Sequence, residues 1–303
     1  MSILAVGSMA LDSVETPFGK AERVLGGSAT YFGTSASFFT EVKLVAVVGD
    51  DFPSEHLEFL ESRSIDTRGV TREKGKTFFW RGKYDYNLNE AQTLDTQLNV
   101  FASFSPQIPP EYAEPSILFL ANIDPELQMN VLKQVKRPGL IALDTMNYWI
   151  NGSLEPLKQA ISQIDLLIIN EGEARQLSNQ INLVQAARTI LGMGIKTLII
   201  KRGEYGVIMF DRTSVFAAPA YPLGSVMDPT GAGDTFAGGF LGYLDNTGNL
   251  DEASLRRAVI FGSVMASYNV EDFSLDRLRR LSHKEIQDRF HKFKALTHFE
   301  GLE

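Results

Sequence analysis

The chain has 303 residues, 44% of them hydrophobic and 22% charged, and a formal net charge of −8 at pH 7. These proportions are ordinary for a soluble globular protein, and the negative charge argues against non-specific binding to nucleic acid. The absence of cysteine excludes disulfides, thiolate catalysis and cysteine-ligated zinc, and it fits the reducing cytoplasm, where we expect the protein to be located. The N-terminus lacks the basic region of a signal peptide, and no apolar run approaches the roughly 20 residues that span a bilayer, so we expect no membrane partner.

The first part of the chain predicts buried strands, a glycine-rich turn and two helices. Apolar runs or amphipathic periodicity predict strands at 3–6 and 43–48 and a helix at 53–62. Asp12 lies in a polar stretch after the first strand. Gly26 and Gly27 precede a helix of small residues, and such a glycine pair lets the backbone approach a ligand closely.

Between residues 75 and 104 the helical periodicity disappears and the composition becomes aromatic and β-branched. Alternation predicts a strand over 77–86 and a second over 92–101, and on the first it places four aromatic side chains on one face: Phe78, Trp80, Tyr84 and Tyr86. We expect these strands, with residues 12–25, to form a small β-sheet lid that closes over a ligand or pairs with a second subunit. The alternative is an ordinary excursion that fills the core.

From residue 115 onward, strands of Leu, Ile and Val alternate with helices. Strands are predicted at 117–121, 140–143, 166–169, 197–200, 207–210 and 215–217, and helices at 126–135, 154–164, 171–177, 183–191, 234–244 and 255–268, followed by an amphipathic tail over 275–296. This alternation indicates a mostly parallel sheet covered on both faces. Because no repeat or flexible linker interrupts it, we expect residues 1–303 to form a single α/β domain.

Polar residues follow several of the predicted strands: Asp12, Asp144, Asn170 and Lys201. Each alone is typical of a turn or a helix cap. Because ligands of open α/β sheets bind beyond the carboxyl ends of the strands, the four together predict a site. Glu173, three residues after Asn170, is either a dipole-stabilised residue of a helix start or a ligand of hydrated Mg²⁺.

The stretch 228–240 predicts a glycine-rich turn that leads into a helix. Gly231 and Gly233 free the backbone, and the amides of the first helical turn would face an anion. Asp234 among these amides is either a general base or merely the N-cap of the helix. Motifs of P-loop enzymes, zinc proteases and nucleophile-elbow hydrolases are absent, and a third glycine of a dinucleotide fingerprint is missing.

These residues together carry a resemblance to a known family. The segment Asp228-Pro-Thr-Gly-Ala-Gly-Asp-Thr-Phe-Ala-Gly-Gly-Phe240 resembles, nearly residue for residue, the C-terminal signature of the ribokinase-like (phosphofructokinase-B) carbohydrate kinases. Gly26-Gly27, Asn170-x-x-Glu173 and Lys201-Arg-Gly-Glu-Tyr-Gly206 are similar to other motifs of the family and occur in the family's order. The resemblance implies a three-layer α/β sandwich with a mostly parallel central sheet and a small β-sheet lid.

The implied activity is transfer of the γ-phosphoryl group of ATP to a hydroxyl of a sugar or sugar-like substrate, with Mg²⁺. The resemblance makes Asp234 the general base, and it assigns the anion hole to the amides of Gly231, Ala232 and Gly233. It implies acceptor contacts from Asp12, Gly26, Gly27, Tyr31 and Asn147. It implies nucleotide contacts from Asn170, Glu173, Lys201, Gly203, Gly206, Thr230 and Asn269, with Glu173 near Mg²⁺ through water.

Three departures from the family pattern bear on the substrate. Tyr31 stands where many members have a substrate-contacting Asn, Asn147 is displaced by one position, and Arg202 replaces a small or apolar residue. The acceptor therefore stays open between a sugar or polyol, a nucleoside whose base stacks on the aromatic lid, and a phosphosugar held by Arg81 or Lys83. A non-catalytic sensor, a monovalent cation such as K⁺ near the anion hole and a homodimer through the lid also stay open.

Overall fold

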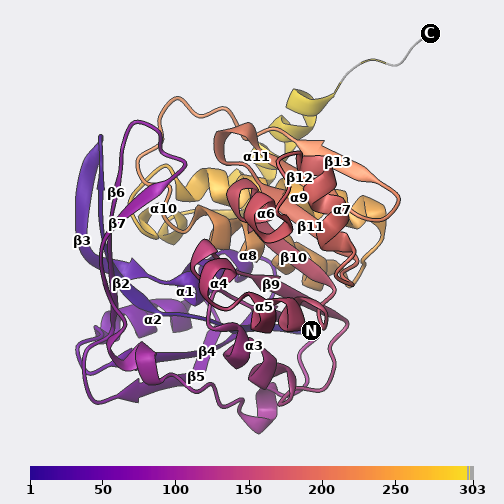
Figure 1. Ribbon diagram of the computed structural model, residues 1–303. Helices are drawn as coiled ribbons and strands as arrows, with labels where there is room; N and C mark the ends of the chain where they lie inside the picture. Colours follow the sequence, from indigo (N-terminus) through magenta and orange to yellow (C-terminus); the bar gives the residue numbers. More distant parts are fainter. Residues whose placement is uncertain (299, 301–303) are drawn as a thin grey trace.

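A nine-stranded sheet forms the centre of the computed structural model, which describes residues 1–298 and 300 (Figure 1). Its strands, in spatial order, are β13 (Val215–Ala218), β12 (Val207–Phe210), β11 (Thr197–Lys201), β10 (Leu166–Asn170), β9 (Leu140–Asp144), β8 (Ile117–Leu120), β1 (Ser2–Val6), β4 (Glu41–Gly49) and β5 (Ile65–Glu73). The seven neighbouring strands from β11 to β5 in this order are parallel to one another. At the other edge, β12 pairs antiparallel with β11, and β13 pairs antiparallel with β12. The expected mostly parallel sheet is confirmed.

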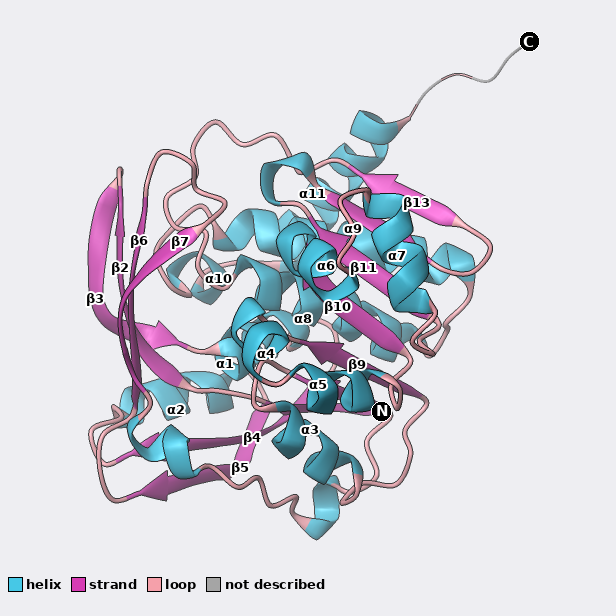
Figure 2. Cartoon of the chain, in the orientation of Figure 1, coloured by secondary structure: helices cyan, strands magenta, loops and turns pink. Residues whose placement is uncertain are grey.

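Helices cover both faces of this sheet and make two separate hydrophobic cores (Figure 2). One core contains α1 (Ser28–Ala36), α2 (Ser54–Ser62), α8 (Ala232–Thr247), α9 (Glu252–Asn269), α10 (Asp276–Arg279) and α11 (His283–Thr297). The other contains α3 (Pro125–Leu132), α4 (Asn147–Gly152), α5 (Leu154–Ile161), α6 (Glu171–Ser178) and α7 (Leu183–Leu191). Strand β1 sends Ile3 and Ala5 into the first core and Leu4 and Val6 into the second, as strand alternation requires. The result is the expected three-layer sandwich.

A second sheet of four strands, which we call the lid, stands beside the sandwich (Figures 1 and 2). Its order is β3 (Gly19–Gly26), β2 (Ala10–Thr16), β6 (Phe78–Tyr84) and β7 (Ala91–Gln97). The polar stretch that contains Asp12 is therefore a strand of the lid. The second predicted lid strand ends early, because Val100 lies in the short 3-10 helix η1 (Asn99–Ser103) and is buried in the second core.

Other predicted boundaries differ for identifiable reasons. Strand β5 was not expected, because its sequence is largely polar and it is an edge strand of the central sheet. The region predicted as a helix over 154–164 contains α5, preceded by the separate helix α4. The C-terminal tail is divided into α10 and α11, since Ser282 and Glu285 form a capping box that starts a new helix.

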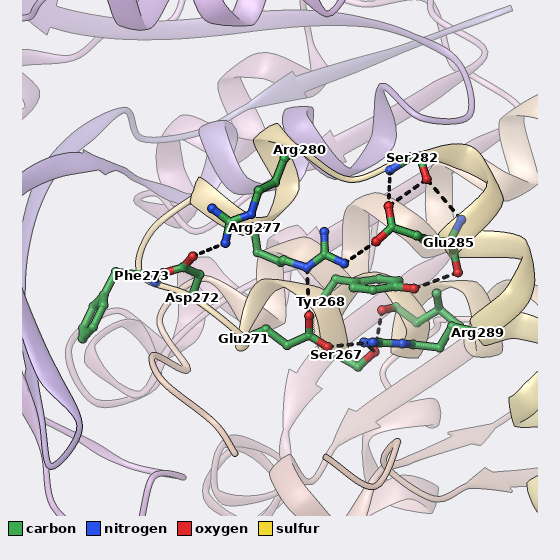
Figure 3. Close-up of polar contacts among 11 residues, drawn as sticks. Ser267, Tyr268, Glu271, Asp272, Phe273, Arg277, Arg280, Ser282, Glu285 and Arg289 are labelled. Carbon is green, nitrogen blue, oxygen red and sulfur yellow. Dashed lines mark hydrogen bonds and ion pairs between the residues drawn. The ribbon is translucent and has the colours of Figure 1, made fainter. Parts of the chain in front are cut away.

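A network of charged side chains holds the C-terminal helices against the end of α9 (Figure 3). The guanidinium carbons of Arg277 and Arg289 lie 4.6 and 3.5 Å from the centre of the Tyr268 ring. Both arginines donate to Glu271, at 2.8 and 2.6 Å, and Arg277 also donates to Glu285 at 2.6 Å. The network fixes the connection between α9 and α10, which contacts the turn before α8.

Candidate active site

A cavity of about 1500 Å³ opens at the carboxyl ends of the parallel strands, between the lid and the start of α8. Asp144, Asn170 and Lys201 end β9, β10 and β11, and all three line it. Asp12 reaches the same cavity from lid strand β2. The four polar residues that the sequence predicted to meet thus lie around one space.

Most of the candidate residues named from the sequence line this cavity. Those that do are Asp12, Gly27, Tyr31, Asn147, Asn170, Glu173, Lys201, Gly203, Thr230, Gly231 and Asp234. The lining does not include the described residues Gly26, Gly206, Ala232, Gly233 and Asn269. Asn269 is buried behind the turn, where its amide donates to the Thr230 carbonyl at 2.8 Å and its oxygen accepts from Thr235 Oγ1 at 3.2 Å. Its place in the fold is a support of the turn before α8.

Helix α8 begins at Ala232, and its N-cap is Gly231 in the left-handed region with φ 73°. Asp234 is the third residue of the helix, three positions after this N-cap. The possibility that Asp234 is the N-cap is therefore wrong. The amide of Ala232 donates to the Pro229 carbonyl at 3.2 Å, an internal bond of the turn that the sequence did not predict.

The carboxyl group of Asp234 lies in the cavity beside other charged groups. Burial raises the pKa of Asp234 to about 7, with a further contribution from Asp144, while Lys201 acts in the opposite direction. A carboxyl group with a pKa near the operating pH suits general base catalysis, since it is ionised when needed and still basic enough to take a proton.

The far end of the cavity combines a buried carboxyl group with glycine backbone. A Cβ on Gly26 would lie 1.9 Å from Asp12 Oδ2, and Gly27 has φ 94° with its Cβ position 2.5 Å from the Ser8 carbonyl. Glycine at position 26 therefore leaves the space that Asp12 occupies, and glycine at position 27 lets the turn approach the backbone of Ser8. Burial and the nearby charge of Asp228 raise the pKa of Asp12 to about 8.

Aromatic side chains form part of the cavity wall, and one of them, Trp80, is paired with Asp12 across β6 and β2. Phe78, Trp80 and Tyr86 of the lid region line the cavity, and Tyr148 lines it from α4. Among the described residues, the buried hydroxyl of Tyr31 has no hydrogen-bond partner. The cavity lining does not include Arg81 or Lys83, and Lys83 instead donates to Glu15 at 2.7 Å.

Another part of the cavity wall is built on the start of α6. Asn170 and Glu173 form a capping box, in which each side chain accepts a hydrogen bond of 2.8 Å from the backbone of the other. Burial, with the nearby charge of Asp144, raises the pKa of Glu173 to about 7. In the part of the chain that the structure describes, no three His, Cys, Asp or Glu residues are placed to hold a metal ion. Glu173 supplies one carboxyl group to the cavity, and a single protein carboxylate suits an Mg²⁺ held mainly by water and phosphate oxygens, the usual manner for this ion.

The sequence did not predict two further parts of the cavity wall. Asn122 follows β8, so the strand-end rule would have found it. Asn89 lies between β6 and β7 and reaches the short helix η3 (Gly203–Tyr205): its oxygen accepts from the Glu204 amide at 3.3 Å, and its nitrogen donates to Glu204 Oε1 at 3.3 Å. This contact joins residues 115 positions apart and has no local sequence signal.

Comparison with known proteins gives consistent matches over nearly the whole chain. Residues 11–277 match the family described as pfkB family carbohydrate kinase. A cytidine kinase from Thermococcus kodakarensis is 31% identical over 80% of this chain and 88% of its own length.

Two solved structures have the same fold. The nucleoside kinase of Methanocaldococcus jannaschii, an archaeal member of the ribokinase family, superimposes with a TM-score of 0.79 at 22% identity, over 96% of this chain and 98% of its own. A ribokinase II candidate from E. coli, in complex with ATP and Mg²⁺, has a TM-score of 0.76 at 17% identity, over 96% and 99% of the two chains. The ribokinase-like fold expected from the sequence is confirmed.

Proposed function

Because this chain belongs to the pfkB family of carbohydrate kinases, we propose that it transfers the γ-phosphoryl group of ATP to a hydroxyl group of a nucleoside. The single observation that carries the choice of acceptor is the aromatic lining of the cavity by Phe78, Trp80 and Tyr86, in which Trp80 is paired with Asp12 across the lid strands. Aromatic side chains stack on a flat base, whereas a carboxyl group and a glycine backbone suit the hydroxyl groups of a ribose. The similarity to a cytidine kinase supports the same class of acceptor.

In this proposal Asp234 takes the proton of the acceptor hydroxyl as its oxygen bonds to phosphorus. The bond between phosphorus and the leaving oxygen breaks, and its electron pair departs with ADP. Phosphoryl transfer mainly requires in-line positioning and stabilisation of charge on the equatorial oxygens, and the start of α8 presents backbone amides and the positive end of a helix dipole for this purpose. We assign the anion hole to the backbone amides from Gly231 to Gly233. The amide of Ala232 also donates a hydrogen bond to the Pro229 carbonyl, so a phosphoryl oxygen would share this donor.

The remaining residues divide between the two substrates. Asp12, Gly27, Tyr31 and Asn147 would contact the acceptor, while Gly26 keeps the space for Asp12. Asn170, Glu173, Lys201, Gly203 and Thr230 would face ATP, and Gly206 and Asn269 would shape the loops that hold it. Mg²⁺ would supply charge neutralisation on the phosphates, and Glu173 would orient its water ligands.

A panel of acceptors tests this function. The protein is mixed with Mg-ATP and, separately, with cytidine, uridine, adenosine, inosine, ribose, inositol and ribose 5-phosphate, and release of ADP is measured. We expect turnover with at least one nucleoside, and Asp234→Asn should lower it by at least about 10²-fold. Turnover with free sugars alone would make the protein a sugar kinase. Nucleotide binding without turnover on any alcohol would identify a sensor and contradict the proposal.

A further inference from the structure

Lys201 brings a buried ammonium group to the start of α8. Its Nζ lies 3.2 Å from Asp144 Oδ2, and the side chains of Lys201 and Asp144 are only 18% and 8% exposed. A Cβ on Gly233 would lie 2.8 Å from the same Nζ, so the ammonium group is against the backbone that begins the helix. The pair thus connects the ends of β11 and β9 to the region assigned to the anion hole.

Lys201 is the basic residue of the cavity lining whose charge acts on Asp234. Three described residues of the cavity lining are basic, Arg175, Lys201 and Arg202, and both arginines bond Glu171 at 2.5 Å. Of these three cations, only Lys201 is near enough to lower the pKa of Asp234, against the larger effect of burial. Burial lowers the pKa of Lys201, but Asp144, Glu173 and Asp234 outweigh this effect and raise it, so the ammonium group stays charged.

Asp144 has a definite part in this arrangement. An ammonium group and a helix N-terminus are both positive, and without a counter-charge they would repel each other. Asp144 supplies that counter-charge and accepts one hydrogen bond from Lys201 Nζ. A lysine has three N–H donors, so this bond leaves donors for another anion in the cavity.

We propose that Lys201 is a catalytic residue whose ammonium group stabilises negative charge on the transferred phosphoryl group, and that Asp144 is a positioning residue that holds this group at the start of α8. The proposal rests on the kinase function proposed above. During transfer Lys201 keeps its proton, Asp234 receives the proton of the acceptor hydroxyl, and the electron pair of the broken bond leaves with ADP. Such a fixed cation acts where charge develops and requires no rearrangement during the reaction.

The test compares Lys201→Met, Lys201→Arg and Asp144→Asn in the full chain, with the most active nucleoside of the panel. We expect Lys201→Met to lower kcat by about 10²- to 10³-fold with the KM for ATP changed by less than about threefold. Lys201→Arg should recover part of kcat, and Asp144→Asn should lower kcat by about tenfold at constant KM. Lys196→Met is the matched control, because Lys196 lies just before the same strand and pairs with Asp165 away from the cavity.

A binding measurement separates catalysis from folding or nucleotide affinity. Calorimetry with Mg-ADP should give equal affinity for the wild type and Lys201→Met, whereas Mg-ADP with aluminium fluoride, a mimic of the transferred group, should bind the variant at least tenfold more weakly. A rise in the KM for ATP that matches the loss of kcat would overturn the proposal and make Lys201 a binding residue only. Equal turnover by the wild type and Lys201→Met would overturn the role of Lys201 and leave the kinase function standing. No turnover by the wild type on any acceptor would overturn the kinase function, and the role of Lys201 with it.

Discussion

The phenol ring of Tyr31 packs directly against Gly231, the N-cap of α8, and both residues line the cavity. A Cβ on Gly231 would lie 2.3 to 2.5 Å from three ring carbons of Tyr31. Tyr31 is buried in α1, and Gly231 precedes α8, so their contact joins the starts of two helices. A change at either residue should therefore be felt at both substrates.

Gly231→Ala should impair activity strongly. The added methyl group meets the Tyr31 ring, and the φ of 73° disfavours any residue with a side chain, so the turn or the ring must move. We expect kcat/KM to fall by at least about 10²-fold, measured by ADP release. Gly224→Ala is the control, because a Cβ there meets nothing within 4 Å. Equal activity of the two variants would contradict the close contact.

Asn89 should transmit nucleotide binding to the lid, since it bonds Glu204 in the short helix η3. The chain has two tryptophans, so Trp149→Phe leaves Trp80 on lid strand β6 as a fluorescent reporter. Addition of Mg-ADP should change the emission of Trp80, and Asn89→Ala should reduce this change by at least half. The measurement needs no acceptor.

Ser103→Ala is a suitable comparison, because its hydroxyl bonds only the Val100 carbonyl among the described contacts, outside the cavity lining. In the Trp149→Phe background, Mg-ADP should change the Trp80 emission of Ser103→Ala as much as it does without this substitution. An unchanged response in Asn89→Ala, together with normal Mg-ADP affinity by calorimetry, would show that the contact with Glu204 does not carry the signal.

The features predicted correctly are those that the sequence marks locally, by a run or period of apolar residues or by the glycines of a turn. Solid apolar strands predicted the parallel sheet, and the carboxyl ends of parallel strands share one edge, which is why Asp144, Asn170 and Lys201 meet. The glycines of the turn before α8 predicted a helix start beside Asp234, and the structure has one there.

The features that were missed depend on contacts between distant segments. Polar β5 is a strand only because it adds to the edge of the sheet beside β4. The bond between Asn89 and Glu204 and the support of Thr230 by Asn269 join parts of the chain that no local pattern connects. The capping role considered for Asp234 was excluded only by the backbone conformation of Gly231.

Glu271 should contribute to stability through the network of Figure 3, and it does not line the cavity. Glu271→Ala leaves Arg277 and Arg289, whose side chains are 15% and 14% exposed, without their shared carboxylate. We expect a loss of about 2 kcal/mol in the free energy of unfolding, less than for a fully buried pair because Glu271 is partly exposed. Urea unfolding measures it. Glu252→Ala, which breaks the exposed pair with Arg256 on α9, should cost below about 0.5 kcal/mol.

The pH dependence of turnover should follow the ionisation of Asp234. A general base acts only when deprotonated, and burial holds the pKa of Asp234 at about 7. We therefore expect kcat/KM to be low at pH 5.5, to rise through pH 7 and to level off above pH 8, measured with the nucleoside of highest activity. A profile already flat at pH 5.5 would mean that Asp234 ionises at an ordinary carboxyl pKa or is not the base.

Asp12, which we propose to contact the acceptor, should reduce stability at high pH. Burial and the charge of Asp228 raise the pKa of Asp12 to about 8, far above the usual carboxyl value of about 3.9. Between these two values the folded state holds a proton that the unfolded state has lost, so the contribution of Asp12 to stability falls as pH rises from about 4 to about 8. Asp12→Asn removes this dependence with little change in shape. We expect its Tm to equal that of the wild type near pH 4 and to exceed it by at least about 2 °C at pH 8.5, while the KM for the acceptor rises at least tenfold. A Tm difference that is the same at both pH values would show that Asp12 is ionised in the folded protein throughout, and the gain would then come from packing and not from the proton.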